Sequence, residues 1–297
     1  MVLYLQFVTS QPTPGLESAC FLSLISVLLF SLLYIAVCKT CKVFKNARLH
    51  RQYLQNASFY SEEIMALYAI GDLHLSLAKD KPMDVFGDRW KGHTERIAEG
   101  FSVLAENDVC VICGDVSWGM GLAETLPDFK FVDALPGKKI ILKGNHDYWW
   151  STATKVKNFF AENGITTIDI LYNNFFEYGE YAICGTRGWF FEEEKGGEHD
   201  RKIMLREVMR LEASLKAAGD RKKLVFLHYP PKYQFYTCPE IVELLKKYEV
   251  RLCCYGHIHG KGCKYALNGW SGGTEYKLVS ADHLLFSPLK LPYGEQI

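Results

Sequence analysis

Lys139-Ile140-Ile141-Leu142, followed by Gly144-Asn145-His146-Asp147, is the stretch that decides how this chain folds. The first four residues form an apolar run that predicts a buried β-strand. Gly and Asn are ordinary turn residues, so the tetrapeptide alone is consistent with a simple strand-ending turn. Asn and His favour neither strands nor cores, however, and a strand that delivers both at its carboxyl end is unusual. The stretch indicates either a turn or a functional loop.

The same pattern recurs at four other strand-like runs, each of which ends in an acidic or imidazole side chain. These ends are Asp72-Leu73-His74, Gly114-Asp115, His228 and Gly256-His257-Ile258-His259. Strand-like and helix-like runs alternate from Met65 onward, which predicts an α/β fold with parallel strands. Ligands bind at the carboxyl ends of strands in such sheets. We therefore expect folding to gather the five motifs at one rim.

The polar side chains of the five motifs, taken together, are typical of a site for two metal ions. They are two carboxylates, one amide and five imidazoles: Asp72, Asp115, Asn145, His74, His146, His228, His257 and His259. Mixed oxygen and nitrogen ligands suit Mn, Fe, Zn, Co or Ni. Eight groups are too many for one ion, and two neighbouring ions can activate water and clamp a phosphoryl group. A lone Asp would more often be a loop cap and a lone His a structural residue, but the full set favours metal binding.

The five motifs, in this order, resemble the motif set of the calcineurin-like metallophosphoesterases. The resemblance covers about Met65 to Phe286, and its details are similar to an uncharacterised bacterial branch of predicted phosphohydrolases. It implies a four-layer α-β-β-α sandwich, in which two β-sheets face each other and helices lie outside. It also implies a phosphoester hydrolase with two divalent metal ions, Mn first among them.

The resemblance assigns the metal ligands to two sets and a bridge. These are Asp72, His74 and His259 for one ion, Asn145, His228 and His257 for the other, and Asp115 between them. His146 would lie near the leaving-group oxygen as general acid or charge stabiliser, with Asp147 orienting it. A hydroxide held between the two ions would attack the phosphoester in line.

Several other residues are weaker candidates. Arg187 could bind a substrate phosphate or form an interlayer salt bridge. The aromatic residues near the motifs could line a substrate pocket, but we expect them to pack in the core or at its rim. They are Trp118, Trp149, Trp150 and Tyr229. Three other histidines of the domain, which match no motif, are expected to be surface or structural residues, namely His93, His199 and His283.

The amino-terminal part of the chain predicts a membrane anchor. Residues 1–18 form a tail, and residues 19–38 are an uncharged, mostly apolar run about as long as a membrane span. Residues 39–64 form a basic collar and linker, in which 39–51 contain five basic and no acidic residues. The positive-inside rule then predicts a single-pass membrane protein whose domain, residues 65–297, is cytoplasmic. A start at Met65 would give a soluble cytoplasmic protein instead.

Net charge and motif content argue against two other classes of function, nucleic-acid binding and oxidoreduction. The 297-residue chain has a formal net charge of zero, so it carries no signal for nucleic-acid binding. The first strand is followed by no Gly-rich dinucleotide loop, which argues against an oxidoreductase. A non-catalytic interaction module at the membrane is the main alternative to an enzyme. Phosphomonoesters, phosphodiesters, pyrophosphates and phosphoproteins all remain possible substrates, and no pattern indicates an oligomeric state.

Overall fold

The computed structural model describes residues 65–78, 81, 83–190 and 197–293. The chain divides into two units, Met1–Glu62 and Glu63–Ile297, and the described residues belong to the second. None of the helices in this described part has both the length and the apolar character needed to cross a bilayer. The predicted tail, membrane span and basic collar lie outside the described residues and stay predictions.

The first sheet carries three of the five motifs. Its strand order is β13-β1-β2-β3-β4, with four parallel strands and an antiparallel edge strand. The strands are β1 (Leu67–Ile70), β2 (Val109–Ile112), β3 (Lys138–Ile141), β4 (Ile168–Ile170) and β13 (Leu289–Leu291). Their parallel direction confirms the predicted α/β class and brings the ends of β1, β2 and β3 to one edge.

The second sheet carries the other two motifs. Its order is β11-β12-β10-β7-β6-β5, and its inner strands β12, β10, β7 and β6 are parallel. The strands are β5 (Phe175–Tyr178), β6 (Tyr181–Thr186), β7 (Lys222–Leu227), β10 (Leu252–Tyr255), β11 (Gly269–Ser271) and β12 (Thr274–Leu278). A separate hairpin joins β8 (Lys232–Tyr233) to β9 (Tyr236–Thr237).

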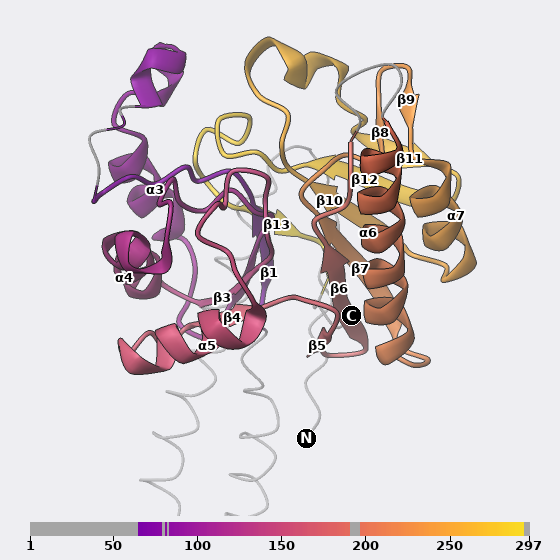
Figure 1. Ribbon diagram of the computed structural model, residues 1–297, viewed down its shortest axis with the longest axis horizontal. Helices are drawn as coiled ribbons and strands as arrows, with labels where there is room; N and C mark the ends of the chain where they lie inside the picture. The colour runs from indigo at the N-terminus through magenta and orange to yellow at the C-terminus, as the bar shows by residue number, and fades with distance from the viewer. Residues whose placement is uncertain (1–64, 79–80, 82, 191–196, 294–297) are drawn as a thin grey trace, which may run out of the picture. The chain divides into compact units, whose positions relative to one another are not determined.

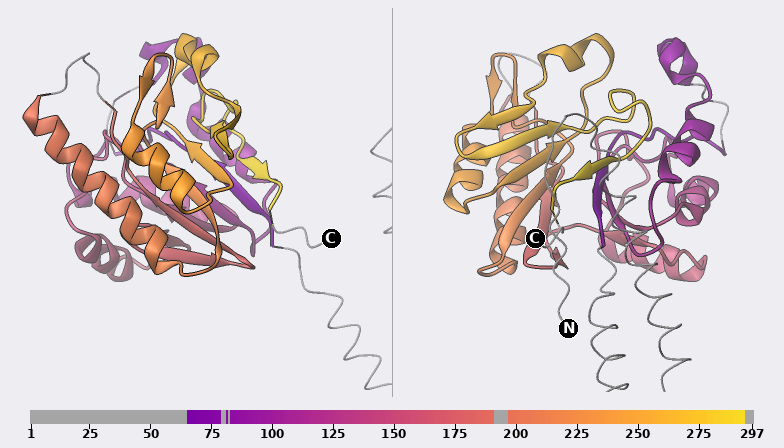
Figure 2. Two further views of the ribbon diagram at one scale, coloured as in Figure 1. Left: turned by 90° about the vertical axis from the view of Figure 1, so that its right-hand side faces the viewer. Right: turned by 180° about the vertical axis from the view of Figure 1, so that it is seen from behind.

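The helices cover the outer face of each sheet (Figures 1 and 2). They are α3 (His93–Phe101), α4 (Leu126–Ala134) and α5 (Ala153–Glu162) beside the first sheet, and α6 (Glu198–Ala217) and α7 (Pro239–Lys247) beside the second. Short 3₁₀ turns complete the structure, at Met83–Phe86, Asp88–Trp90, Leu122–Thr125 and Gly260–Tyr265.

Alternation along the strands builds separate cores on the two faces of each sheet. In β1, Tyr68 and Ile70 pack toward the helices, whereas Leu67 and Ala69 pack toward the second sheet. Cys110 and Cys113 likewise fall in different cores, because residues three apart in an extended chain point to opposite faces, and both are free thiols. The core between the sheets holds their carboxyl edges together, and the motif loops meet there.

One expectation about secondary structure is wrong and another is confirmed in part. The run after Lys91 has a helix-like pattern to about Asn107, but the helix ends at Phe101. It ends there because the Asp108 carboxylate accepts hydrogen bonds from the backbone N–H groups of Ala105 and Ala66 and fixes a turn. The segment from Tyr265 to Phe286 has the sequence pattern of two or three antiparallel strands, with turns at Asn268-Gly269 and Gly272-Gly273. The structure confirms two of them, the hairpin β11–β12 with its turn at Gly272-Gly273. In addition, β12 pairs in parallel with β10 and so joins the hairpin to the second sheet.

Candidate metal centre

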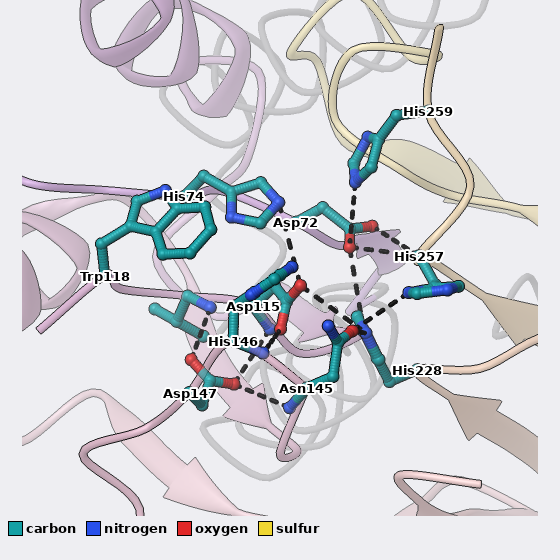
Figure 3. A network of polar contacts seen from close by, with 12 residues as sticks. Asp72, His74, Asp115, Trp118, Asn145, His146, Asp147, His228, His257 and His259 are labelled. Carbon is teal, nitrogen blue, oxygen red and sulfur yellow. Dashed lines mark hydrogen bonds and ion pairs between the residues drawn. The ribbon is translucent and has the colours of Figure 1, made fainter. Parts of the chain in front are cut away.

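The loops that follow five strands converge at one rim, as Figure 3 shows for their side chains. Backbone hydrogen bonds join the loops: Asp72 N donates to Gly114 O at 2.9 Å, and Gly256 N donates to His228 O at 3.0 Å. The two sheets are linked where His257 N donates to the Asp72 carboxylate at 3.0 Å. All five predicted motifs therefore lie together, even though their residues are far apart in the sequence.

Two glycines permit this convergence by close approach. A Cβ on Gly144 would lie 2.0 Å from Asp115 Oδ1, and one on Gly256 would lie 2.4 Å from Asp72 Oδ2. Each glycine thus makes room for the carboxylate of a different loop. The Gly that opens Gly-Asn-His-Asp and the Gly that opens Gly-His-Ile-His are needed for space.

Strained backbone is concentrated at the rim. Four of the predicted ligands, Asp72, His74, Asp115 and His257, have positive φ values of 59°, 48°, 52° and 71°. Non-Gly residues rarely adopt this conformation, and each instance has a cost that the surrounding structure must offset. Such strain typically marks functional sites, because it aims side chains that a relaxed loop would point elsewhere.

The first group of potential ligands is Asp72, His74 and His259, whose ligand atoms lie within 4.8 Å of one another. Asp72 and His74 are buried, and His259 Nε2 lies 3.6 Å from Asp72 Oδ1. This is the same set that the resemblance assigns to one metal ion. Three converging donors of this kind are suited to a divalent transition metal.

The second group is Asp72, Asp115 and His228, also within 4.8 Å. Asp72 is common to both groups, whereas the resemblance assigns the bridging position to Asp115. Asp115 is nevertheless close to a histidine of each group, because its Oδ2 is 3.8 Å from His74 Nε2 and 3.6 Å from His228 Nε2. Either carboxylate is placed to contact both groups.

The side chain of Asn145 lies beside the second group and makes an informative contact with its member His228. Its Oδ1 lies 2.5 Å from His228 Nε2 and 3.0 Å from His257 Nδ1. His228 Nδ1 lies 2.9 Å from the carbonyl oxygen of Cys113, which can only accept, so Nδ1 carries the proton of the neutral ring. Nε2 is then an acceptor facing the amide oxygen of Asn145. Two acceptors pointing at one another suit a shared cation, so these residues fit the metal ion that the family implies.

The histidines of the centre are held mostly in the neutral form that binds metals. Burial lowers the pKa of His228, burial and the neighbouring His259 lower that of His74, and burial and His228 lower that of His257 to about 3. The exception is His259: burial opposes its charge, but Asp72 and Asp282 outweigh burial and raise its pKa to about 10. A proton on His259 supplies the positive charge that these carboxylates attract, and a bound cation would supply it instead.

Burial also affects the pKa values of the two carboxylates, Asp115 and Asp72. Burial raises the pKa of Asp115 well above its usual range, and the nearby charges of Asp147 and Asp72 raise it further. Burial acts in the same direction on Asp72, but the charge and hydrogen bond of His259, together with the charges of His228 and His74, outweigh burial and lower the pKa of Asp72. Two buried carboxylates so close together repel one another, which is a cost that a shared divalent cation would offset.

Asp282 is a functional residue that sequence reasoning missed. Its Oδ1 accepts a hydrogen bond from His259 Nδ1 at 2.9 Å, and its Oδ2 accepts from Gly260 N at 2.9 Å and from Arg89 at 3.0 Å. A carboxylate on the far nitrogen of a ligating histidine fixes the ring and leaves Nε2 free for the metal. The residue follows no recognisable motif, so only its place in the fold reveals this role.

His146 lies at the opening of the centre. Its ring centroid is 4.5 Å from that of Trp118, which also stacks on His74 at 5.0 Å. Nδ1 of His146 lies 3.1 Å from the Tyr148 hydroxyl, which can donate to it and leave a proton on Nε2. Burial, with the nearby charges of His228 and Lys81, lowers the pKa of His146 to about 4. The ring is therefore neutral near pH 7 and serves as a hydrogen-bond donor.

Asp147 has a different position from the one expected. Its carboxylate accepts hydrogen bonds from the backbone N–H groups of Asp115, Val116 and Gly144 at 2.7–2.9 Å, and from the indole of Trp149 at 3.0 Å. The ring of His146 bonds to Tyr148 instead. Asp147 thus ties the loop after β2 to the loop after β3, and it positions their backbones rather than the imidazole directly.

Comparison with known proteins settles the family. A family model described as calcineurin-like phosphoesterase matches residues 65–261. The chain belongs to this family. It is accordingly a hydrolase of phosphoric ester bonds, and its Asp and His groups can bind divalent metal ions. A search of curated proteins finds no match.

Solved structures add a likeness of fold. The phosphopantetheinyl hydrolase of Mycobacterium tuberculosis is 15% identical, with a TM-score of 0.52, over 78% of this chain and 97% of that one. A protein of unknown function from Aquifex aeolicus is 19% identical, with a TM-score of 0.44, over 76% of this chain and 95% of that one. At these identities the first likeness concerns the fold alone.

Most of the residues that were weaker candidates for substrate binding in this phosphoesterase have structural roles. Arg187 lies 3.6 Å from Glu207 in an ion pair, and its carbonyl oxygen accepts from the backbone of His228. Trp149 and Trp150 are buried in the core between the first sheet and its helices, as expected. Tyr229 is also buried, and its ring packs on the ring of His257 at 4.5 Å. Of the aromatic candidates, Trp118 is the one that lines a pocket beside the metal centre.

Proposed function

We propose that this phosphoesterase hydrolyses a phosphate ester or diester at a pair of divalent transition-metal ions. The observation that carries the proposal is the pair of ligand groups that share Asp72, each within 4.8 Å. The close approach of Asn145 Oδ1 and His228 Nε2 supports a second ion, because it places two acceptors against one another. Mn is our first candidate, and Fe, Zn, Co and Ni suit the same donors.

We assign the roles of the residues as follows. Asp72, His74 and His259 would hold one ion. Asn145, whose Oδ1 faces both His228 and His257, would hold the other together with these two histidines. Asp115 would contact both ions. Such ions, when bound, polarise phosphoryl oxygens and lower the pKa of a water molecule. His146, with its Nε2 proton, would donate a hydrogen bond to the leaving oxygen as negative charge develops there.

The proposed reaction is a direct, in-line hydrolysis. A water oxygen bonds to phosphorus as the bond to the leaving oxygen breaks, and the alcohol departs with one proton of the water. No side chain forms a covalent intermediate in this scheme. His146 acts on the leaving side, which predicts that its loss lowers kcat more than it raises KM.

The test is hydrolysis of bis-p-nitrophenyl phosphate with Mn²⁺, together with the number of bound metal ions. His146→Ala should keep the bound metal and lose roughly 100-fold in kcat, the usual range for a positioned acid or donor. Asp115→Asn should lose both metal and activity. His283→Ala, an exposed histidine outside the centre, is the matched control and should behave as wild type. Metal binding without activity towards any phosphate ester would favour the non-catalytic interaction module instead.

We also propose that residues 19–38 anchor the enzyme in the cell membrane, with the catalytic domain in the cytoplasm. The support is the uncharged apolar run and the basic residues that follow it. The full chain should sediment with membranes, and a variant that begins at Met65 should stay in the supernatant. A soluble full chain would show that the enzyme is cytoplasmic without an anchor.

A further inference from the structure

A pocket of about 530 Å³ opens beside the candidate metal centre. Three of its lining residues, His74, His146 and His259, belong to the centre itself. Its volume falls within the usual range for sites that enclose a small organic ligand. Anything bound at the metals with its leaving group directed past His146 would place that group in this pocket.

The other walls of the pocket are largely apolar. Met83, Phe86, Trp90 and Trp118 supply thioether and aromatic surface. Trp90 and Trp118 are buried and held in place by ring packing against His74. Phe86, in contrast, is 60% exposed, so it can cover a bound molecule without first leaving the core. These walls favour a flat, apolar body.

The Lys and Arg side chains that line the pocket give it positive charge. Arg89 and Lys261 line it, and no acidic side chain does so among the described residues. Lys81 adds a third positive charge, because its Nζ lies 3.2 Å from the ring centroid of Trp118. The side chain of Arg89 is 47% exposed although one of its nitrogens pairs with Asp282, so the other nitrogens can reach a ligand. Cations at the edge of an apolar pocket favour a ligand with an anionic group.

We propose that this pocket holds the leaving alcohol of the substrate, and that this alcohol has an aromatic or similarly flat apolar body with a second anionic group. The assignment of the pocket to the leaving alcohol rests on the proposed function, because it requires His146 to act on the leaving side. The apolar body packs against Phe86 and the indoles. The anionic group lies toward Lys261 and Arg89.

Binding of a product-like alcohol tests the pocket without any catalytic step. The probe is 6-hydroxy-2-naphthoate, which combines an aromatic alcohol with a carboxylate, measured by calorimetry on the full-length protein. 2-Naphthol, which lacks the carboxylate, should bind more weakly, and 6-(aminomethyl)-2-naphthol more weakly still. Phe86→Ala should weaken binding of both naphthol and hydroxynaphthoate roughly fivefold, the effect of one lost apolar contact. Lys261→Gln should weaken only the carboxylate probe, roughly threefold.

Two neighbouring residues provide matched controls. Val85 is 72% exposed and Lys264 is also exposed, and neither lines the pocket. Val85→Ala and Lys264→Gln should bind every probe as wild type does. Equal binding of the carboxylate and aminomethyl probes, or equal effects of Phe86→Ala and Val85→Ala, would overturn the proposal.

Hydrolysis then separates this proposal from the proposed function. With Mn²⁺, 6-carboxy-2-naphthyl phosphate should have a higher kcat/KM than phenyl phosphate, and Phe86→Ala should reduce that preference. Equal hydrolysis of both esters would overturn the pocket assignment while leaving the phosphoesterase function intact. Probe binding without hydrolysis of any ester would overturn the role of the alcohol as leaving group, and with it the function on which this inference rests.

Discussion

Replacing Asp282 by Asn tests whether a residue that is not itself a metal ligand affects metal binding through its contact with His259. The Asp282 side chain is completely buried, and it accepts hydrogen bonds from His259, Gly260 and Arg89 at 2.9, 2.9 and 3.0 Å. Asn keeps the shape but removes the negative charge. The amide oxygen still accepts a hydrogen bond from His259 Nδ1, but it carries no charge, so it no longer raises the basicity of Nε2.

The structure sets the size of two separate effects. Loss of a carboxylate that supports a ligating histidine typically costs 10- to 100-fold in metal affinity, or about 1.4–2.7 kcal/mol. Stability should also fall, because the NH₂ group of the introduced amide would take the place of Oδ2 and face two donors, Gly260 N–H and the Arg89 guanidinium. A buried donor without an acceptor costs about 1–3 kcal/mol in the free energy of unfolding.

Calorimetric titration with Mn²⁺ and urea unfolding of the metal-free protein measure the two effects independently. Asp88→Asn is the matched control, because Asp88 is an exposed residue whose side chain pairs, among the described residues, with Lys91 alone, at 2.8 Å. It should change neither quantity beyond about 0.5 kcal/mol. A folded Asp282→Asn protein that binds Mn²⁺ as tightly as wild type would refute the argument that this carboxylate supports His259.

Three further predictions concern packing and charge. Trp118→Phe should lower kcat for bis-p-nitrophenyl phosphate roughly fivefold, because a smaller ring supports His74 and His146 less well, whereas the exposed Trp270→Phe should not. Gly100→Ala should lower the free energy of unfolding in urea by about 3 kcal/mol, since its Cβ would lie 2.2 Å from the carbonyl oxygen of Phe286. Gly121→Ala, whose Cβ would meet nothing within 4 Å, should have little effect and so serves as its control. Burial raises the pKa of Asp133, but hydrogen bonds from the backbone and hydroxyl of Thr167 outweigh burial and lower it. A lowered pKa gives stability at neutral pH that is lost as the pH falls through it, so the difference in Tm between wild type and Asp133→Asn should narrow below about pH 4.

The sequence by itself determined the chemistry of the centre and the edge at which it forms. Apolar runs marked the strands, and the residues after each run marked their carboxyl ends. Parallel strands must present those ends on the same side, so the sequence alone predicts that one rim holds Asp72, Asp115, Asn145, His228 and His257. These features depend on local patterns and on residue type, which a sequence displays directly.

Only the tertiary structure decided how those side chains pair and what supports them. The core between the two sheets brings the Asn145 amide against His228, and it brings Asp282 to the back of His259. It also turned Asp147 away from its expected partner, toward the backbone of two loops. Such contacts depend on strand register and on packing between distant segments, and no local residue pattern encodes them. The types of ligand could therefore be predicted from the sequence. The residues that contact and orient those ligands are determined only by the tertiary structure.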